Sequence, residues 1–156
     1  MTPNWSCDLA IAPQGALDRI SAAINVRSKR AFGVLKTANE YVGVVGASEF
    51  EIWERQKRAI HARGRVEPKH GGTRLEVDFV TPLRTRIVVG LFFALYAVVS
   101  LGIATQPPDA GVSASEVVVS ALGAIALVLL FIAGARSQRA DLTGLLERTF
   151  ADVRRI

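Results

Sequence analysis

The sequence is poor in the residues from which most catalytic and metal-binding sites are made. Its 156 residues include one cysteine and two histidines. A single cysteine excludes an internal disulfide framework and a zinc site with several cysteine ligands. Half of the chain is hydrophobic and 21% is charged, a composition that excludes a disordered or a collagen-like chain. The length is typical of one domain.

The histidines and the cysteine form no recognisable site. His61 and His70, with Glu67 between them, are the candidate metal ligands, but their spacing fits no compact zinc pattern. We therefore expect two surface histidines and no metal. Cys7 has no histidine near it in the sequence, so we expect a free thiol near a frayed terminus, in a reducing compartment. The first 25 residues lack the basic start and apolar run of a signal peptide.

Motifs for catalysis are also missing. Glu49 and Glu51 share one face of an expected strand and form a candidate acid–base pair, with Glu54 nearby. Basic residues follow directly, which favours a solvated, ion-paired face instead. The chain contains neither a Gly-x-Ser-x-Gly nucleophile motif nor a phosphate-binding loop. We expect a protein that is not an enzyme and needs no cofactor.

Charge is absent from two long stretches. Residues 87–104 hold 15 apolar residues out of 18, and residues 117–135 hold 16 out of 19. As helices they would be about 27 and 28 Å long, close to the thickness of roughly 30 Å of the hydrocarbon core of a bilayer. The connection, residues 105–116, contains Pro107, Pro108 and Gly111, which end a helix. The sequence predicts a transmembrane hairpin, residues 87–135, between a domain of residues 1–86 and a C-terminal segment of residues 136–156.

Basic residues flank this hairpin on both sides and are absent from its connection. Because Lys and Arg stay on the cytoplasmic side, both termini are expected in the cytoplasm and the connection outside. The net charge of +5 is then explained by anionic lipid head groups, and no nucleic-acid partner is expected. We predict a basic rim at the membrane surface. It consists of Arg55, Lys57, Arg58, Arg63, Arg65, Arg84, Arg86, Arg136 and Arg139.

Residues 1–86 predict a helix followed by an antiparallel meander. Leu17, Ile20 and Ile24 recur at helical spacing within residues 13–30. The period then changes to two, which indicates strands. The expected strands are residues 31–37, 41–45, 49–55, 60–66 and 73–80. Clean alternation in the last of them places Arg74, Glu76 and Asp78 on one face. That face is expected to be solvated or near the head groups, and helices are expected to cover the other. The predicted fold class is an α+β membrane protein.

Two further sets of residues suggest contacts between helices. Residues 136–156 predict an amphipathic helix whose stripe packs on the sheet, binds a partner or lies in the head groups. The stripe is Leu142, Leu145, Leu146, Phe150 and Val153. Small residues spaced four apart in the spans predict close packing within the hairpin, or association with another copy or a larger partner. They are Gly90 and Ala94 in the first span and Ser120, Gly123 and Ala124 in the second.

Four short runs give the chain a resemblance. They are Tyr41-Val42-Gly43-Val44-Val45-Gly46, Phe50-Glu51-Ile52, Gly64-Arg65-Val66 and Gly71-Gly72-Thr73-Arg74-Leu75. Over residues 31–135 the chain resembles small bacterial membrane proteins in which a cytoplasmic β-domain precedes a two-helix hairpin. The resemblance implies this architecture and an inner-membrane location. It implies no catalytic residue.

The sequence therefore favours a non-enzymatic, membrane-anchored interaction or scaffold module. A protein partner or a second copy of the chain would bind at the cytoplasmic face of the membrane. The first alternative is binding of a lipid or another apolar ligand inside the β-domain, which requires an apolar cavity. The second alternative is a subunit of an oligomeric pore, although the two spans carry no ionisable group.

Overall fold

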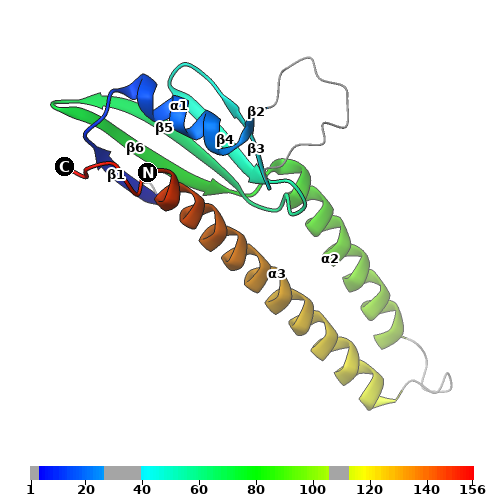
Figure 1. Cartoon of the computed structure of the whole chain (residues 1–156). Coiled ribbons are helices and arrows are strands. Elements are labelled where there is room, and N and C mark those ends of the chain that lie inside the picture. Colours follow the sequence, from blue (N-terminus) through cyan, green and yellow to red (C-terminus); the bar gives the residue numbers. More distant parts are fainter. Residues whose placement is uncertain (1–3, 27–39, 106–112) are drawn as a thin grey trace. The chain divides into compact units, whose positions relative to one another are not determined.

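The structure is a computed structural model that describes residues 4–26, 40–105 and 113–156. The chain divides into two compact units (Figure 1). The sheet unit comprises Met1–Thr81 and Ser137–Ile156, and the hairpin unit comprises Pro82–Arg136. The class is α+β: the described residues form five antiparallel strands, one short parallel strand and three helices, two of them long and apolar. The coarse prediction of the fold is therefore confirmed.

The sheet unit is built on one mixed sheet with the strand order β1-β6-β5-β4-β3-β2. The strand pairs β1–β6, β6–β5, β5–β4 and β4–β3 are antiparallel. The short edge strand β2 pairs in parallel with β3. The elements are β1 (Trp5–Leu9), α1 (Pro13–Ala23), β2 (Asn25–Val26), β3 (Tyr41–Val45), β4 (Glu49–Glu54), β5 (His61–Lys69) and β6 (Gly72–Val80).

The edge strand β1 lies where a frayed terminus was expected, so that expectation is wrong. Cys7 is paired with Leu75 of β6 and is half-buried. The sequence does carry a pattern that indicates this strand, because Trp5, Cys7 and Leu9 alternate with polar residues. The predicted strand at residues 31–37 lies outside the described residues.

Helix α1 is shorter than predicted. It ends at Ala23, and Ile24 is extended, with φ −124° and ψ 165°. Asn25–Val26 then pair with Val42 and Gly43, so the prediction of a helix through these residues is wrong. Ile24 is buried, but it reaches the core from extended backbone. The β-branched residues Ile24 and Val26 favour a strand over a continued helix.

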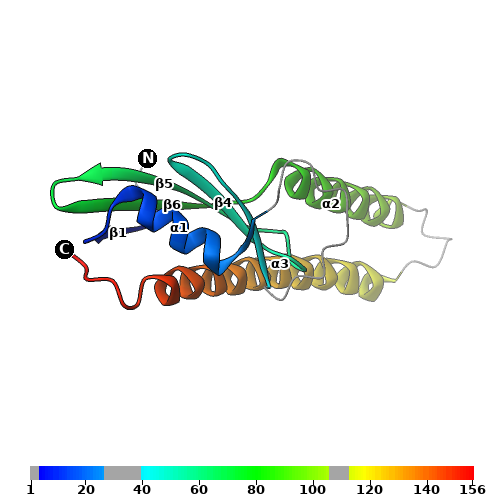
Figure 2. The same cartoon turned by 45° about the horizontal axis from the view of Figure 1, so that its top comes forward.

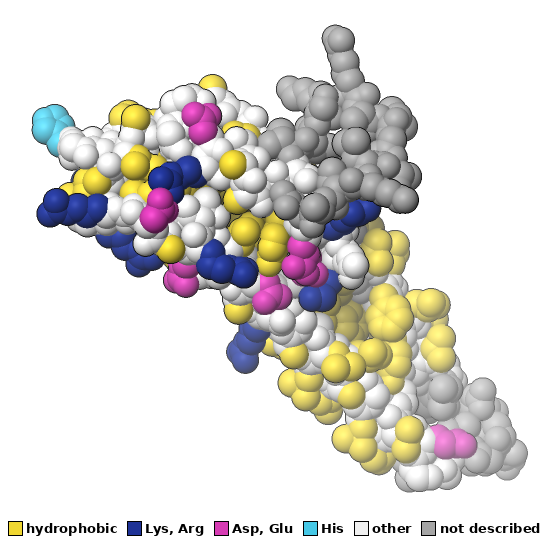
Figure 3. Space-filling model, viewed as in Figure 1, with side chains coloured by type: hydrophobic (Ala, Val, Ile, Leu, Met, Phe, Trp, Pro, Cys, Tyr) yellow, Lys and Arg dark blue, Asp and Glu magenta, His cyan; other side chains and the backbone are white. Residues whose placement is uncertain are grey.

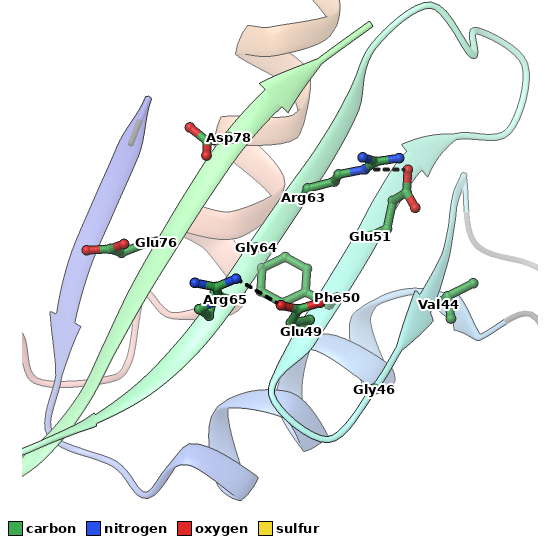
Figure 4. Close-up of a pocket in the computed structure, with 10 residues that line it drawn as sticks. All are labelled: Val44, Gly46, Glu49, Phe50, Glu51, Arg63, Gly64, Arg65, Glu76 and Asp78. Carbon is green, nitrogen blue, oxygen red and sulfur yellow. Dashed lines mark hydrogen bonds and ion pairs between the residues drawn. The ribbon is translucent and has the colours of Figure 1, made fainter. Parts of the chain in front are cut away.

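One face of the sheet is covered by α1 and by the end of α3 (Ala114–Thr149), as Figures 2 and 4 show. Helix α1 contributes Ala16, Leu17 and Ile20 to the core, and the sheet contributes Ile52, Leu75 and Val77, among others. From the predicted C-terminal stripe, Leu142, Leu146, Phe150 and Val153 are buried and Leu145 is half-buried. Polar contacts fix the same end: Arg19 of α1 pairs with Asp152 at 2.5 Å, and the backbone N–H of Ile60 donates to Gln138 Oε1 at 3.0 Å.

Helix α3 is continuous over 36 residues. The predicted boundary at residue 136 therefore falls inside one continuous helix, at the point where the hairpin unit ends and the sheet unit resumes. The prediction of helix to residue 156 is wrong, because α3 ends at Thr149 and Phe150 and Val153 follow it in a turn. A helix of this length measures about 54 Å, well beyond the roughly 30 Å of a bilayer core. Its first part is apolar and exposed, and its last part, from Ser137, belongs to the sheet unit.

The hairpin unit joins α2 (Leu83–Ala104) to the first part of α3 through hydroxyl groups. Tyr96 donates its hydroxyl proton to the backbone carbonyl of Ser120, and the side-chain oxygens of Ser100 and Ser120 lie 2.9 Å apart. Hydrogen bonds between helices of this kind hold apolar helices together where water is absent.

This contact decides which face of α2 meets α3, and it contradicts part of the packing prediction. Ser120, Gly123 and Ala124 are half-buried, and a Cβ at Gly123 would lie 3.0 Å from the hydroxyl of Tyr96. Ala94 is exposed, and nothing lies within 4 Å of a Cβ at Gly90. At 3.6 residues per turn, Ala94 lies about 200° around the helix from Tyr96. Packing of Gly90 and Ala94 inside the hairpin is therefore wrong.

Large apolar side chains cover both long helices, as the yellow surface in Figure 3 shows. Leu83–Gly102 and Ser115–Thr149 each contain a window that is long and apolar enough to cross a membrane. No part of either window is buried within the structure. The core helices of a soluble protein are mostly covered, and these two windows are not.

Candidate functional site

The sheet face opposite α1 and α3 is the candidate functional site, here called the open face. No described helix packs on it, and its side chains come from alternate positions of the strands. Most are charged, in agreement with the alternation seen in the sequence. The charged and histidine side chains of the open face are Asp8, Glu49, Glu51, His61, Arg63, Arg65, Glu67, Lys69, Arg74, Glu76 and Asp78.

A shallow hollow of about 660 Å³ lies at the centre of this face (Figure 4). Its floor is the cross-strand pair of Phe50 and Gly64. Phe50 alternates with Glu49 and Glu51 along β4, so its buried ring lies on the covered face of the sheet. There the far end of the ring lies over Gly64, where a Cβ would come within 2.0 Å of Phe50 Cζ. The absence of a side chain at Gly64 thus makes room for the ring. Four carboxylates and two guanidinium groups surround the floor: those of Glu49, Glu51, Glu76, Asp78, Arg63 and Arg65.

The two arginines of β5 bind the carboxylates of β4. Arg63 Nε lies 3.2 Å from Glu51 Oε1, and an Nη of Arg65 lies 3.1 Å from Glu49 Oε1. Both pairs follow the strand register, which sets Arg63 opposite Glu51 and Arg65 opposite Glu49. The arginine side chains are about three-fifths exposed, so each pair is a solvated contact that contributes little stability. The pairs do fix where the positive charge lies.

Glu51 has a second partner. His61 Nδ1 lies 2.8 Å from Glu51 Oε1, and the His61 ring stacks on Trp53 with 4.9 Å between ring centroids. Partial burial raises the pKa of Glu51, but hydrogen bonds from His61 and Arg63 outweigh this and hold the pKa below its ordinary value. Trp53 is 7% exposed, and its indole N–H finds no acceptor among the described residues.

The carboxylates of β6 are compensated less completely than those of β4. Glu76 pairs with Arg74 at 3.1 Å, but Arg74 also lies 3.9 Å from Asp8. Asp78 accepts hydrogen bonds from the backbone and side-chain nitrogens of Asn4, and it has no cationic partner among the described residues. Figure 4 shows Glu76 pointing toward β1, away from the arginines of β5. The hollow carries four negative and two positive charges, a net of −2.

The predicted basic rim is distributed over several elements. Arg63 and Arg65 lie in the hollow and are paired, while Arg55, Lys57 and Arg58 lie in the connection between β4 and β5. Lys57 pairs with Glu54 at 3.2 Å. The remaining members are Arg84 and Arg86 at the start of α2, and Arg136 and Arg139 in the middle of α3.

The candidate residues for metal binding and nucleophilic catalysis, which are the two histidines and Cys7, do not come together in one site. His61 is on the open face, whereas His70 is in the β5–β6 turn beside Gly71, which adopts a left-handed φ of +83°. Within the described ranges, no three His, Cys, Asp or Glu side chains are arranged to hold a metal ion. Burial raises the pKa of the Cys7 thiol, which leaves it protonated and weakly nucleophilic at neutral pH.

The lowered pKa of Glu51 gives a test of the ion-paired face. A carboxylate whose folded pKa is depressed stabilises the fold above its unfolded pKa and loses that contribution as the pH falls through the folded value. We expect the stability that depends on Glu51 to be present at neutral pH and to disappear below about pH 4.5. Urea unfolding in detergent should therefore show Glu51→Gln to be less stable than the wild type at pH 7 and equal to it at low pH. Glu67→Gln, on the same face but in none of these ion pairs, should leave this pH dependence unchanged.

No family model, curated protein or solved structure matches the chain.

Proposed function

We propose that the chain is a membrane-anchored protein-interaction module. Helix α2 and the apolar part of α3 hold it in the bilayer, and the sheet unit presents its open face to a partner. The observation that carries the proposal is an ordered, charged sheet face that no described helix covers, on a unit whose other face is fully packed.

Membrane anchoring is supported by the exposed apolar surface of two helices. The chain segments before and after the hairpin, up to Thr81 and from Ser137, fold into one unit. Two spans between them must therefore leave and return on the same side of a bilayer. The arginines that flank the spans, and the acidic connection between them, favour the cytoplasmic side. With the resemblance to bacterial hairpin proteins, this supports the inner membrane of a bacterium.

The packing of the sheet unit favours interaction over lipid binding. Phe150, Leu17, Ile52 and Leu75 are among the side chains that fill its core to less than 2% exposure. The large hollow is open and lined by charged groups, not by the apolar walls that hold a lipid tail. A pore is disfavoured because the hydroxyl groups of Tyr96, Ser100 and Ser120 bond to one another inside the hairpin.

Site-specific photo-crosslinking tests the proposal. A photoreactive phenylalanine analogue replaces Val44, which borders the hollow and is 36% exposed, in full-length protein made in the cells that naturally contain it. The matched control carries the same analogue at Ser21 on α1, on the covered side of the sheet. We expect the protein to stay in membranes washed with alkaline carbonate. We also expect discrete protein adducts from position 44 that are absent from position 21.

Each component of the proposal has its own contradicting result. Release by alkaline carbonate would contradict the membrane anchor. Identical adducts at both positions, or none at position 44, would contradict the open face as the interaction surface. An adduct of twice the mass of the chain would identify the partner as a second copy.

A further inference from the structure

The charge of the open-face hollow is opposite in sign to that of the whole chain. The chain carries +5, whereas the four carboxylates and two guanidinium groups of the hollow sum to −2. Groups that line a shallow concave surface act together on an approaching partner, because fields from like charges add. The hollow therefore attracts cations and repels anions.

The geometry identifies which carboxylates are available. Arg63 and Arg65 are directed at Glu51 and Glu49 on β4, so the positive charge of β5 is already engaged on that side. Glu76 and Asp78 on β6 stand opposite Arg65 and Arg63 in the strand register, but their contacts are with other residues: Arg74 for Glu76 and Asn4 for Asp78. They are two residues apart on one face of a strand, which separates them by about 7 Å.

We propose that the open face binds a basic, extended segment of a partner protein, with Lys or Arg side chains at alternate positions. This inference rests on the proposed function and specifies the chemistry of the partner. Alternate side chains of an extended segment repeat at the same distance of about 7 Å, so two cations meet Glu76 and Asp78 together. Charge-assisted hydrogen bonds from Lys or Arg to carboxylates are stronger than neutral ones.

An anionic lipid head group would bring negative charge to the hollow instead of positive charge, and the hollow is not suited to bind it. A phosphate placed between Glu76 and Asp78 would face two carboxylates without a free arginine, because Arg63 and Arg65 already bind Glu51 and Glu49. Like charges this close disfavour binding. The open face is therefore assigned to a protein partner, and the basic residues that flank the spans are left to the lipid surface.

Peptide binding tests this inference on the full chain. The protein is placed in nanodiscs of the zwitterionic lipid phosphatidylcholine, so that the lipid itself does not attract the probe. The probe is a fluorescein-labelled peptide of alternating Lys and Ser, and the control probe replaces every Lys with Glu. Fluorescence anisotropy should detect binding of the Lys peptide alone, and the affinity should fall as salt is added.

Two matched double variants locate the site. Glu76→Gln with Asp78→Asn removes two negative charges from the hollow. Asp18→Asn with Glu147→Gln removes two from exposed positions on the covering helices. The first pair should weaken binding of the Lys peptide about tenfold, and the second should change it less than twofold. Because the two variants have the same net charge, only the position of the carboxylates differs between them.

Absence of Lys-peptide binding, or equal weakening by both double variants, would overturn the inference. Binding of the Glu peptide in place of the Lys peptide would also overturn it. These results leave the crosslinking test of the proposed function untouched. A partner that crosslinks at position 44 but contacts the open face without a basic segment would contradict this inference and support the interaction module.

Discussion

Replacing Phe150 with alanine should lower the free energy of unfolding of the sheet unit by about 3–5 kcal/mol, the usual cost of removing a fully buried aromatic ring. Phe150 is 1% exposed and follows directly after α3. Its ring helps to fasten the end of a helix whose first part belongs to the hairpin unit. The loss should therefore appear as early unfolding of the sheet unit, with the apolar part of α3 still helical.

Tryptophan fluorescence during urea unfolding of the full chain in detergent measures this effect. Both tryptophans, Trp5 and Trp53, belong to the sheet unit, so the signal does not report on the hairpin. Leu145→Ala is the matched control, because Leu145 is in the same stripe but only half-buried, and it should cost clearly less. A loss below about 1 kcal/mol for Phe150→Ala would show that the end of α3 is not part of the core.

The sequence predicted those elements whose apolar period is long and unbroken. Alternation predicted β4 and β6 to within a residue, and apolar length predicted α2 and the start of α3. It failed at β1 because five residues are too few to distinguish a strand from a terminus. It failed at the end of α1 because Ile24 satisfies a helical spacing and a strand position equally well. Burial alone does not distinguish the two.

The candidate site could be predicted only in its parts. Arg74, Glu76 and Asp78 were expected on one face, and so was the pair of Glu49 and Glu51. The sign of the charge on that face depends on which strands are neighbours and in what register, and both are long-range properties. Summing the basic residues along the chain favoured an anion-binding rim. Pairing them across β4 and β5 leaves a hollow of opposite sign.

The hairpin shows a similar limit. Small residues four apart in the first span predicted the contact between the spans, yet the contact is made by Tyr96 and Ser100. In an apolar environment, leaving a hydroxyl group without a hydrogen-bond acceptor costs more free energy than is gained by close packing of small residues. The polar residues therefore set the rotation of α2, and its small residues face outward.

Gly64 should tolerate no side chain while Phe50 is present. A methyl group at Gly64 would lie 2.0 Å from the Phe50 ring, so Gly64→Ala is expected to cost about 3 kcal/mol in the same urea experiment. Phe50→Leu removes the far edge of the ring and should cost about 1–2 kcal/mol by itself. The double variant should be about as stable as Phe50→Leu alone, since the second change removes the atoms with which the first collides.

If the stability losses of the two single variants do not add in the double variant, the cost of Gly64→Ala is caused by a steric clash with Phe50 and not by a lower strand propensity. If Gly64→Ala were costly for a reason unrelated to Phe50, the two losses would add in the double variant. Gly15→Ala gives the control for glycine replacement itself, because nothing lies within 4 Å of a Cβ there and alanine favours the interior of α1. It should be neutral or stabilising by up to about 1 kcal/mol. Additive losses at Gly64 and Phe50 would mean that the ring does not rest on the glycine.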